Sequence, residues 1–233
     1  MGPSQGSAAT LREHVEALIA SSGADGVAVA YADVLGDDAL AIDADHPFHP
    51  ASTFKVCVLM EVWRQADAGR FELETPVSIV NAFESIADGS PYAMIAADDS
   101  DATLYERVDR SATVRELANM MITRSSNLAT SLLINLVSAS AVTAFMAELG
   151  APDLIVRRGP EDNVAYARGL NNSVTAGGLL HILLRLARGE VVSPRASMGA
   201  NRMTMSAWAR CGRMNSSDSG SRFLRSSRTS SSV

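Results

Sequence analysis

The sequence is poor in several residue types that particular functions need. Its 233 residues hold two cysteines, Cys57 and Cys211, in no CxxC-type spacing, and four scattered histidines, too few ligands for a zinc site. No apolar run reaches the length of about 18 residues that indicates a membrane-spanning helix, and the net charge of −6 argues against a nucleic-acid surface. Apolar residues still make up 47% of the chain, enough for a globular core.

Two further absences concern the ends of the chain. The N-terminus, MGPSQGSAATLREHV, lacks the apolar segment of a secretory signal, so the protein as written is expected in the cytoplasm, or in the periplasm or outside the cell if a leader is missing. After Arg195 come six arginines, many serines and one acidic residue, Asp218, a composition that buries too little apolar surface to offset its ordering entropy. We expect a flexible N-terminus over 1–10, a domain over 11–195, and a Ser/Arg-rich aberrant or disordered tail over 196–233.

The domain is expected to begin with a hairpin that is followed by helices. Leu11–Ser21 has the apolar spacing of an amphipathic helix, and two Val/Ala-rich strands on either side of 35–38 predict a β-hairpin. An apolar pattern nearly all round predicts a buried helix from Ser52 or Thr53 to about Ala68, with Cys57 as a buried thiol. Further helices are expected over 114–122, 128–137, 141–149 and about 175–190, with irregular segments over 76–111 and 152–173. This order predicts an α+β fold with a helical lobe.

Lysine occurs once in the chain, at position 55, against nineteen arginines. It follows Ser52 by three residues, so the two side chains would share a face of the expected helix. A serine hydroxyl is a poor nucleophile until a base takes its proton. Burial and nearby positive charge lower the pKa of a lysine, whereas arginine stays protonated in proteins. The pair predicts a nucleophile, Ser52, and its base, Lys55; the alternative is that Ser52 only caps the helix.

A second serine lies between two expected helices. In ITRSSNLATSLL, Ser125 and Asn127 fall where one helix ends and the next begins, so their side chains can point out of the turn. Taken alone, Ser-x-Asn is also an ordinary capping sequence. Its position after the Ser52–Lys55 pair favours a second part of one active site.

With these motifs, HPASTFKV and MITRSSNLATSLLI, the chain resembles class A serine β-lactamases and their penicillin-interacting relatives over about residues 11–194. The resemblance implies a β-lactamase/transpeptidase-like fold, a small-molecule β-lactam substrate, and no metal or organic cofactor. It also implies that the β-lactam ring is opened through a serine acyl-enzyme, in antibiotic resistance or β-lactam catabolism. Ser52 would be acylated, Lys55 would accept its proton, Ser125 would relay a proton to the leaving nitrogen, and Asn127 would bind the substrate's side-chain amide.

The chain departs from the family pattern in the residues around these motifs. Ser126 stands where the family usually has an aspartate, so we expect the turn to be held less firmly. Deacylation in the family needs a glutamate on an omega-type loop, and Glu161 is the candidate. The family closes this loop with an arginine–aspartate pair, and the matching acidic position here is Asn172. An asparagine follows the family's glutamate closely, whereas Asn171 lies much further on.

The family's third motif, Lys-Thr-Gly on a core strand, has no lysine to match it. Arg228-Thr229-Ser230 imitates it only in composition, and the last strands of the sheet have no counterpart. We therefore expect an incomplete domain whose C-terminal strands are missing, and a tail that is a frameshifted reading of a longer gene. The alternatives are a penicillin-binding-type peptidase or esterase with the same Ser/Lys pair, or a catalytically dead truncated relative. The sequence does not indicate an oligomeric state.

Overall fold

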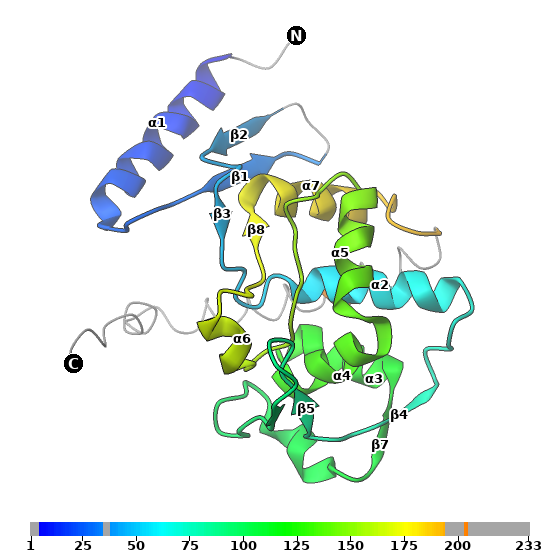
Figure 1. The fold of residues 1–233 in the computed structure, drawn as a ribbon. Helices are drawn as coiled ribbons and strands as arrows, with labels where there is room; N and C mark the ends of the chain where they lie inside the picture. Colours follow the sequence, from blue (N-terminus) through cyan, green and yellow to red (C-terminus); the bar gives the residue numbers. More distant parts are fainter. Residues whose placement is uncertain (1–4, 35–37, 194–202, 205–233) are drawn as a thin grey trace, which may run out of the picture.

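The structure is a computed structural model that describes residues 5–34, 38–193 and 203–204. Figure 1 shows α1 and the β1–β2 hairpin at one end of the molecule, helices α2 to α5 at the other, and β3 and β8 between them. The elements follow one another in the order α1 (Gln5–Ser22), β1 (Val29–Ala32), β2 (Ala39–Ile42), β3 (Pro47–Phe48), α2 (Lys55–Asp67), β4 (Pro76–Ser78), β5 (Phe83–Glu84), β6 (Pro91–Tyr92), the 3₁₀-helix η1 (Ala102–Arg107), β7 (Ser111–Thr113), α3 (Val114–Thr123), α4 (Asn127–Val137), α5 (Ala139–Glu148), α6 (Asn163–Ala167), β8 (Val174–Thr175) and α7 (Ala176–Ala187).

The sheets are short and antiparallel. β1 pairs with β2, Val29 opposite Ile42, which confirms the hairpin; residues 35–37 of its turn lie outside the described ranges. β3 pairs with β8, β4 with β7, and β5 with β6. α7 packs against β1. A helical lobe joined to small antiparallel sheets confirms the predicted α+β class.

The helical lobe agrees with the prediction in its elements and differs at some boundaries. α3, α4 and α5 begin within two residues of the expected positions, and Thr113, Ser126 and Ser138 cap their N-termini with side-chain oxygens. α1 begins at Gln5, inside the segment expected to be flexible, because the small residues before Leu11 include good helix formers. The loop expected over 152–173 contains α6, which at five residues is too short to show a helical period.

α2 lies at the centre of the helical lobe and packs against α3, α4 and α5. Its pattern predicted burial on nearly all sides, and the structure confirms it. Cys57 is fully buried, and burial raises the pKa of its thiol to about 12, so this cysteine is structural rather than reactive. Each large apolar side chain in this core stabilises the fold by about 1.5–3 kcal/mol. The largest fully buried ones in the lobe are Leu59, Met60, Leu117, Met121, Leu128, Leu133 and Met146.

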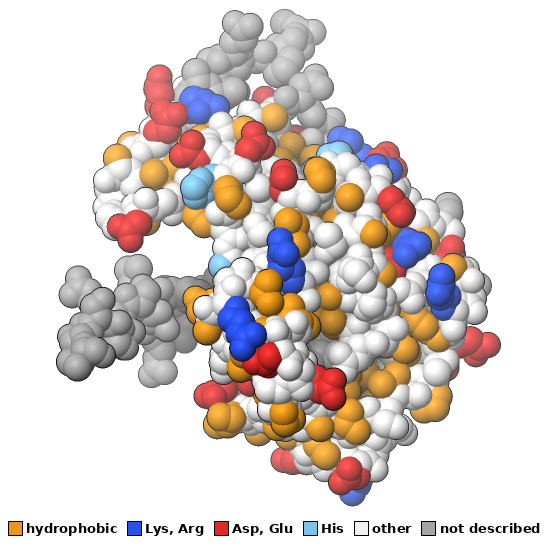
Figure 2. All heavy atoms as spheres, viewed as in Figure 1, with side chains coloured by type: hydrophobic (Ala, Val, Ile, Leu, Met, Phe, Trp, Pro, Cys, Tyr) orange, Lys and Arg blue, Asp and Glu red, His pale blue; other side chains and the backbone are white. Residues whose placement is uncertain are grey.

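Helix length and surface side chains are two further features of the described residues. Within the described residues no single helix has the length and apolar composition needed to cross a membrane, and α4 with α5 meets that test only as a pair bent by 77°. On the face shown in Figure 2, acidic, basic and apolar side chains are interspersed, and the described residues form no continuous basic patch there.

Candidate active site

Ser52 lies in the turn that leads from β3 into α2. Ala51 adopts a left-handed φ of 46°, and the Lys55 N–H donates to Ser52 O at 3.2 Å. The helix therefore begins at Lys55 and not at Ser52 or Thr53, which corrects the expected start. Ser52 is exposed, whereas Lys55 is 2% exposed. The candidate nucleophile faces solvent beside a buried amine.

The Lys55 amine reaches the junction of α3 and α4. Its Nζ lies 2.7 Å from Ser125 O, 3.0 Å from Ser125 Oγ and 2.9 Å from Asn127 Oδ1. Ser125 Oγ lies 2.9 Å from Ser52 Oγ. The hydrogen-bonded connection between Ser52 and Lys55 thus runs through Ser125.

Burial governs the charge of Lys55. Desolvation lowers the pKa of its ammonium to about 8, and the negative charges of Asp99 and Glu161 oppose this shift. The direction of the shift agrees with the sequence-based expectation, but one of the two expected causes is wrong. Among the residues that the structure describes, the charges that act on the amine are acidic and oppose its deprotonation.

The backbone presents Ser125 to the other two residues. Ser125 has a φ of 58°, in the left-handed region, between the end of α3 and the N-cap of α4. A non-glycine residue there costs about 1–2 kcal/mol, which the capping and the contacts of its side chain offset. The predicted helix–helix junction is confirmed, and it turns the hydroxyl toward Ser52 and Lys55.

Asn127 joins Lys55 to Glu161. Its Oδ1 accepts from Lys55 Nζ, and its Nδ2 donates to Glu161 Oε1 at 3.0 Å. The amide orientation is fixed by its partners, because Nδ2 can only donate and a carboxylate can only accept. The second oxygen of Glu161 lies 3.4 Å from the Ile95 N–H. All five sequence-predicted site residues therefore form one hydrogen-bonded cluster.

The loop that carries Glu161 is closed at its base by hydrogen bonds to two asparagines. Asn172 Oδ1 accepts from the N–H groups of Arg157 and Arg158 at 2.8 and 3.1 Å, and Asn172 Nδ2 donates to Arg158 O at 3.0 Å. Arg158 NH2 donates to Asn171 Oδ1 at 3.2 Å. Asparagine at 172 thus closes the loop through the backbone, where the family pattern led us to look for an acid.

The carboxylate of Asp162 anchors the same loop through three hydrogen bonds. It accepts from Ser85 Oγ at 2.7 Å, from Ile86 N at 3.0 Å and from Ala165 N at 3.0 Å, and the last contact caps α6. Asp162 is 1% exposed. Glu161, one residue earlier, has a φ of 62° and points to the opposite side, toward Asn127. Two consecutive residues therefore have different surroundings: the Asp162 carboxylate anchors the loop, and the Glu161 carboxylate faces the candidate site.

Two pockets meet at the cluster. One of about 380 Å³ contains Ser52, Lys55, Asn127 and Glu161. The other, about 280 Å³, also includes Ser52 and Lys55, adds Ser125, and has apolar walls from α2, α3 and α7. Both pockets therefore border Ser52.

Sequence reasoning missed several residues of the larger pocket. His49, Asn163 and Tyr166 line it. His49 accepts the Ala51 N–H through Nδ1 at 3.2 Å and stacks edge-on with Tyr166, with ring centroids 6.3 Å apart. Asn163 follows Glu161 by two residues, so its proximity in the sequence could have identified it, whereas the prediction considered only Asn171.

Other predictions fall outside the described residues or stay open. Arg228-Thr229-Ser230 and Cys211 lie outside, as does nearly all of the segment 196–233, so their interpretation stays a prediction. Across residues 5–34, 38–193 and 203–204, no group of three or more His, Cys, Asp or Glu side chains is placed to hold a metal ion.

The chain is similar to known proteins in its sequence pattern and in its fold. A model of the β-lactamase enzyme family matches residues 10–205. A single-site variant of the class A β-lactamase of the last common ancestor of Gram-negative bacteria has a TM-score of 0.68 and 26% identity, with 83% of this chain and 69% of that one covered. No curated protein matches the sequence significantly.

Two further structures show the likeness of fold. The β-lactamase of Sphaerobacter thermophilus DSM 20745 has a TM-score of 0.64 and 23% identity, with 86% of this chain and 69% of that one covered. A mutant of PBP-A, solved as an acyl-enzyme complex with penicillin G, has a TM-score of 0.65 and 21% identity, with 82% and 66% covered. The chain spans about two thirds of each of these structures.

Proposed function

The chain belongs to the β-lactamase enzyme family, and from this premise we propose that it is a class A-type β-lactamase that opens the β-lactam ring by acylating Ser52. The observation that carries the proposal is the hydrogen-bonded chain from Ser52 Oγ through Ser125 Oγ to Lys55 Nζ, at 2.9 and 3.0 Å. Family membership supports a β-lactamase-like serine hydrolase. The ring-opening activity and the roles below are the proposal.

The surroundings of Lys55 accept both protonation states, because the ammonium donates to Ser125 O, Ser125 Oγ and Asn127 Oδ1. A neutral amine has two N–H donors and one lone pair, and the Ser125 carbonyl and Asn127 Oδ1 can only accept. Those two acceptors take both donors, so the lone pair is left to accept the Ser125 hydroxyl proton. Ser125 Oγ can then accept the proton of Ser52. The three groups form a path from nucleophile to base once the hydroxyls rotate.

Acylation follows from this path. As Ser52 Oγ attacks the lactam carbonyl carbon, its proton moves to Ser125 Oγ and the Ser125 proton moves to Lys55 Nζ. The C–N bond then breaks, and the nitrogen takes a proton from Ser125, which Lys55 replenishes. With a Lys55 pKa of about 8, about a tenth of the molecules hold the neutral amine at pH 7. The positive end of the α2 dipole lies beside Ser52 and favours the developing oxyanion.

Deacylation is assigned to Glu161. Its carboxylate lies in the same pocket as Ser52, one hydrogen bond from Asn127. A water held there would lose a proton to Glu161 while its oxygen attacks the acyl carbon, and Ser52 Oγ would leave with that proton. In a cell this turnover would destroy β-lactams, either as antibiotic resistance or in β-lactam catabolism. The substrate is a small molecule, and no step requires a metal or organic cofactor.

Two measurements test the proposal. Intact-mass spectrometry after brief exposure to benzylpenicillin should show a single adduct, and peptide mapping should place it on Ser52. Nitrocefin should be hydrolysed with turnover. A stable adduct without turnover would instead indicate the penicillin-binding-type peptidase or esterase, and a chain without any adduct would be the catalytically inactive relative.

A further inference from the structure

The N-terminus of α4 is capped by two residues that are far apart in the sequence. The first N–H groups of a helix have no partner within the helix. Ser126 Oγ accepts only the Ala129 N–H, at 3.3 Å. The Asn127 and Leu128 N–H groups donate to the carboxylate of Asp99, each at 2.9 Å. Asp99 therefore supplies the negative charge at this helix start, where the short Ser126 side chain caps one group.

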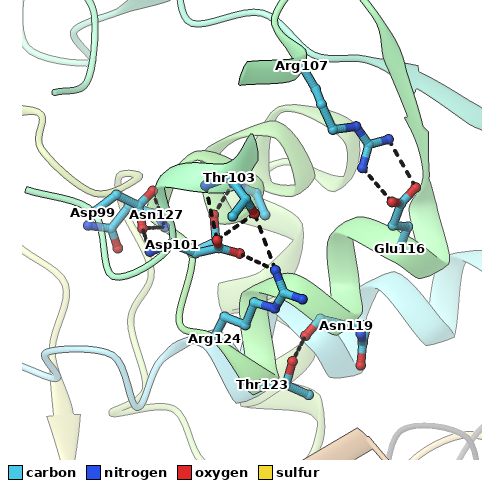
Figure 3. Close-up of polar contacts among 11 residues, drawn as sticks. Asp99, Asp101, Thr103, Arg107, Glu116, Asn119, Thr123, Arg124 and Asn127 are labelled. Atoms are coloured by element: carbon cyan, nitrogen blue, oxygen red, sulfur yellow. Dashed lines mark hydrogen bonds and ion pairs between the residues drawn. The ribbon is translucent and has the colours of Figure 1, made fainter. Parts of the chain in front are cut away.

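The segment that carries Asp99 is itself held in place. The Asp99 carboxylate also accepts the Asp101 N–H and the Tyr105 hydroxyl, both at 3.0 Å. Figure 3 shows Asp99 against Asn127, with Asp101 between Thr103 and Arg124 beside it. Asp101 accepts from the Thr103 N–H at 3.1 Å and from Arg124 NH1 at 3.4 Å. A carboxylate with four donors on a braced segment is a firm anchor.

This anchor acts on the centre of the candidate site. Asp99 holds the backbone of Asn127, and the Asn127 side chain holds the Lys55 amine and the Glu161 carboxylate. Asp99 and Glu161 are also the two charged groups that act on Lys55, and both raise the pKa of its ammonium against the larger effect of desolvation. Asp99 is thus linked to the base both mechanically and electrostatically.

We propose that Asp99 is a positioning residue of the active site. From a distant segment it supplies the carboxylate that the turn at Ser126 lacks. It holds Asn127, and through Asn127 it holds Lys55 and Glu161. The expectation of a looser turn is thereby revised, because the anchoring carboxylate is present at another position. The kinetic consequence rests on the proposed function, whereas the geometric one does not.

The first test needs no substrate. Because Lys55 is the only lysine, protein grown on ¹³C,¹⁵N-lysine gives one side-chain signal, which can be titrated by NMR. Asp99→Asn keeps the side-chain shape and removes the charge, so the Lys55 midpoint should fall by about 0.5 to 1 in pH. Asp98→Asn, the same change at the exposed neighbouring residue, should leave it in place. A midpoint that does not fall in Asp99→Asn would overturn the proposal.

The second test measures acylation of Ser52 by benzylpenicillin across pH. In the wild type the rate should rise with pH to a plateau, with a midpoint near the Lys55 pKa of about 8. Asp99→Asn should lower the plateau about tenfold and move the rising limb to lower pH, whereas Asp98→Asn should do neither. A purely structural defect would lower the rate without moving the limb, and that result would count against the proposal.

A compensating change tests the anchoring directly. Ser126→Asp in the Asp99→Asn background returns a carboxylate to the start of α4, so the acylation rate should recover most of the loss. A double variant no faster than Asp99→Asn would contradict the anchoring role. Should the wild type form no adduct at all, the proposed function fails, while the NMR titration still decides the inference about Asp99.

Discussion

At Lys55 the proposed mechanism needs a base that can lose its proton, and burial lowers the pKa of this ammonium. Lys55→Arg keeps a positive charge on a long side chain but removes that ability, since a guanidinium stays protonated. We expect acylation of Ser52 to fall by about 10³-fold or more, while far-ultraviolet circular dichroism stays that of the wild type. Arg70→Lys, the reverse exchange at an exposed position after α2, is the matched control and should not change the rate. Substantial acylation in Lys55→Arg would reject the role of the amine.

Glu161 is tested by the fate of the adduct. Glu161→Ala removes the carboxylate in the pocket that would activate water, so the acyl-enzyme should form and persist. The expected result is loss of nitrocefin turnover by about 10³-fold with a stable Ser52 adduct by mass spectrometry. Glu84→Ala, which removes another carboxylate outside this pocket, should leave turnover unchanged. Unchanged turnover in Glu161→Ala would show that a different group activates the water.

At the scale of residues, the sequence identified side chains that stand out by type and order along the chain. It missed a side chain that is distinguished only by its contacts in the folded protein. Ser52, Lys55, Ser125, Asn127 and Glu161 stood out by type and order, and the structure brings them together. Their catalytic roles stay predictions. Asp99 lies in the run AADDSDA, where nothing in composition or spacing distinguishes one acid from the next. Only the fold reveals which carboxylate meets the start of α4.

The close contact between the Glu161 loop and α4 sets the position of that loop. A Cβ on Gly159 would lie 2.7 Å from Ser131 Oγ. Gly159→Ala should therefore push the loop outward, cost about 1–3 kcal/mol in unfolding free energy and slow deacylation about tenfold. Gly26→Ala, where the added Cβ has room, is the control.

Removal of the Ser131 hydroxyl should reverse the effect of Gly159→Ala. Its hydroxyl is buried without a hydrogen-bond partner among the described residues, so Ser131→Ala alone should be neutral or slightly stabilising. With that oxygen gone, the nearest Ser131 atom lies 3.5 Å from the new Cβ, an ordinary contact. Ser131→Ala should restore deacylation to Gly159→Ala, as measured by nitrocefin turnover. Failure of this rescue would mean that the contact does not position the loop.

Elements with long apolar periods were predicted well, and short ones were not. α3, α4 and α5 follow from their apolar spacing and from the caps at Thr113, Ser126 and Ser138. α6 owes its existence to the Asp162 cap and to contacts with a distant segment, which a local pattern cannot reveal. The start of α2 was misplaced because Ser52 is a good cap by type, while the backbone turns tightly there.

Stability against pH is a property of the whole molecule to which Lys55 contributes measurably. Folding lowers the pKa of its ammonium from 10.5 to about 8, so the unfolded chain binds more protons between these values. The unfolding free energy therefore rises with pH across this window, by about 3 kcal/mol for this group. Below pH 8 both states are protonated and the full penalty remains; above 10.5 it is gone.

The measurement is a difference between two proteins. Between pH 8 and 10.5, urea unfolding should show the unfolding free energy of the wild type rising relative to that of Lys55→Met. Cys57 and Tyr92, whose pKa values burial raises to about 12, weaken both proteins at high pH and cancel in the comparison. A difference that stays constant across this range would mean that the amine is not desolvated in the folded state.

For the molecule as a whole, the helical lobe and the order of its elements could be predicted. The pairing of strands from distant parts of the chain could not. The pairing of β3 with β8 joins residues 47–48 to 174–175, and only tertiary structure creates such a contact. The interpretation of the segment 196–233 stays a prediction, because all of it except residues 203 and 204 lies outside the described ranges.

Because the only lysine is buried at the start of α2, proteolytic cleavage at this residue indicates that the helix has opened. A protease specific for lysine can cut this chain at one peptide bond, between Lys55 and Val56, and that bond lies at the start of the central helix, which must unravel before any protease can grip it. With enough protease to make cleavage faster than reclosing, two fragments would appear at the rate at which α2 opens, so their accumulation would measure the local opening of the helical lobe.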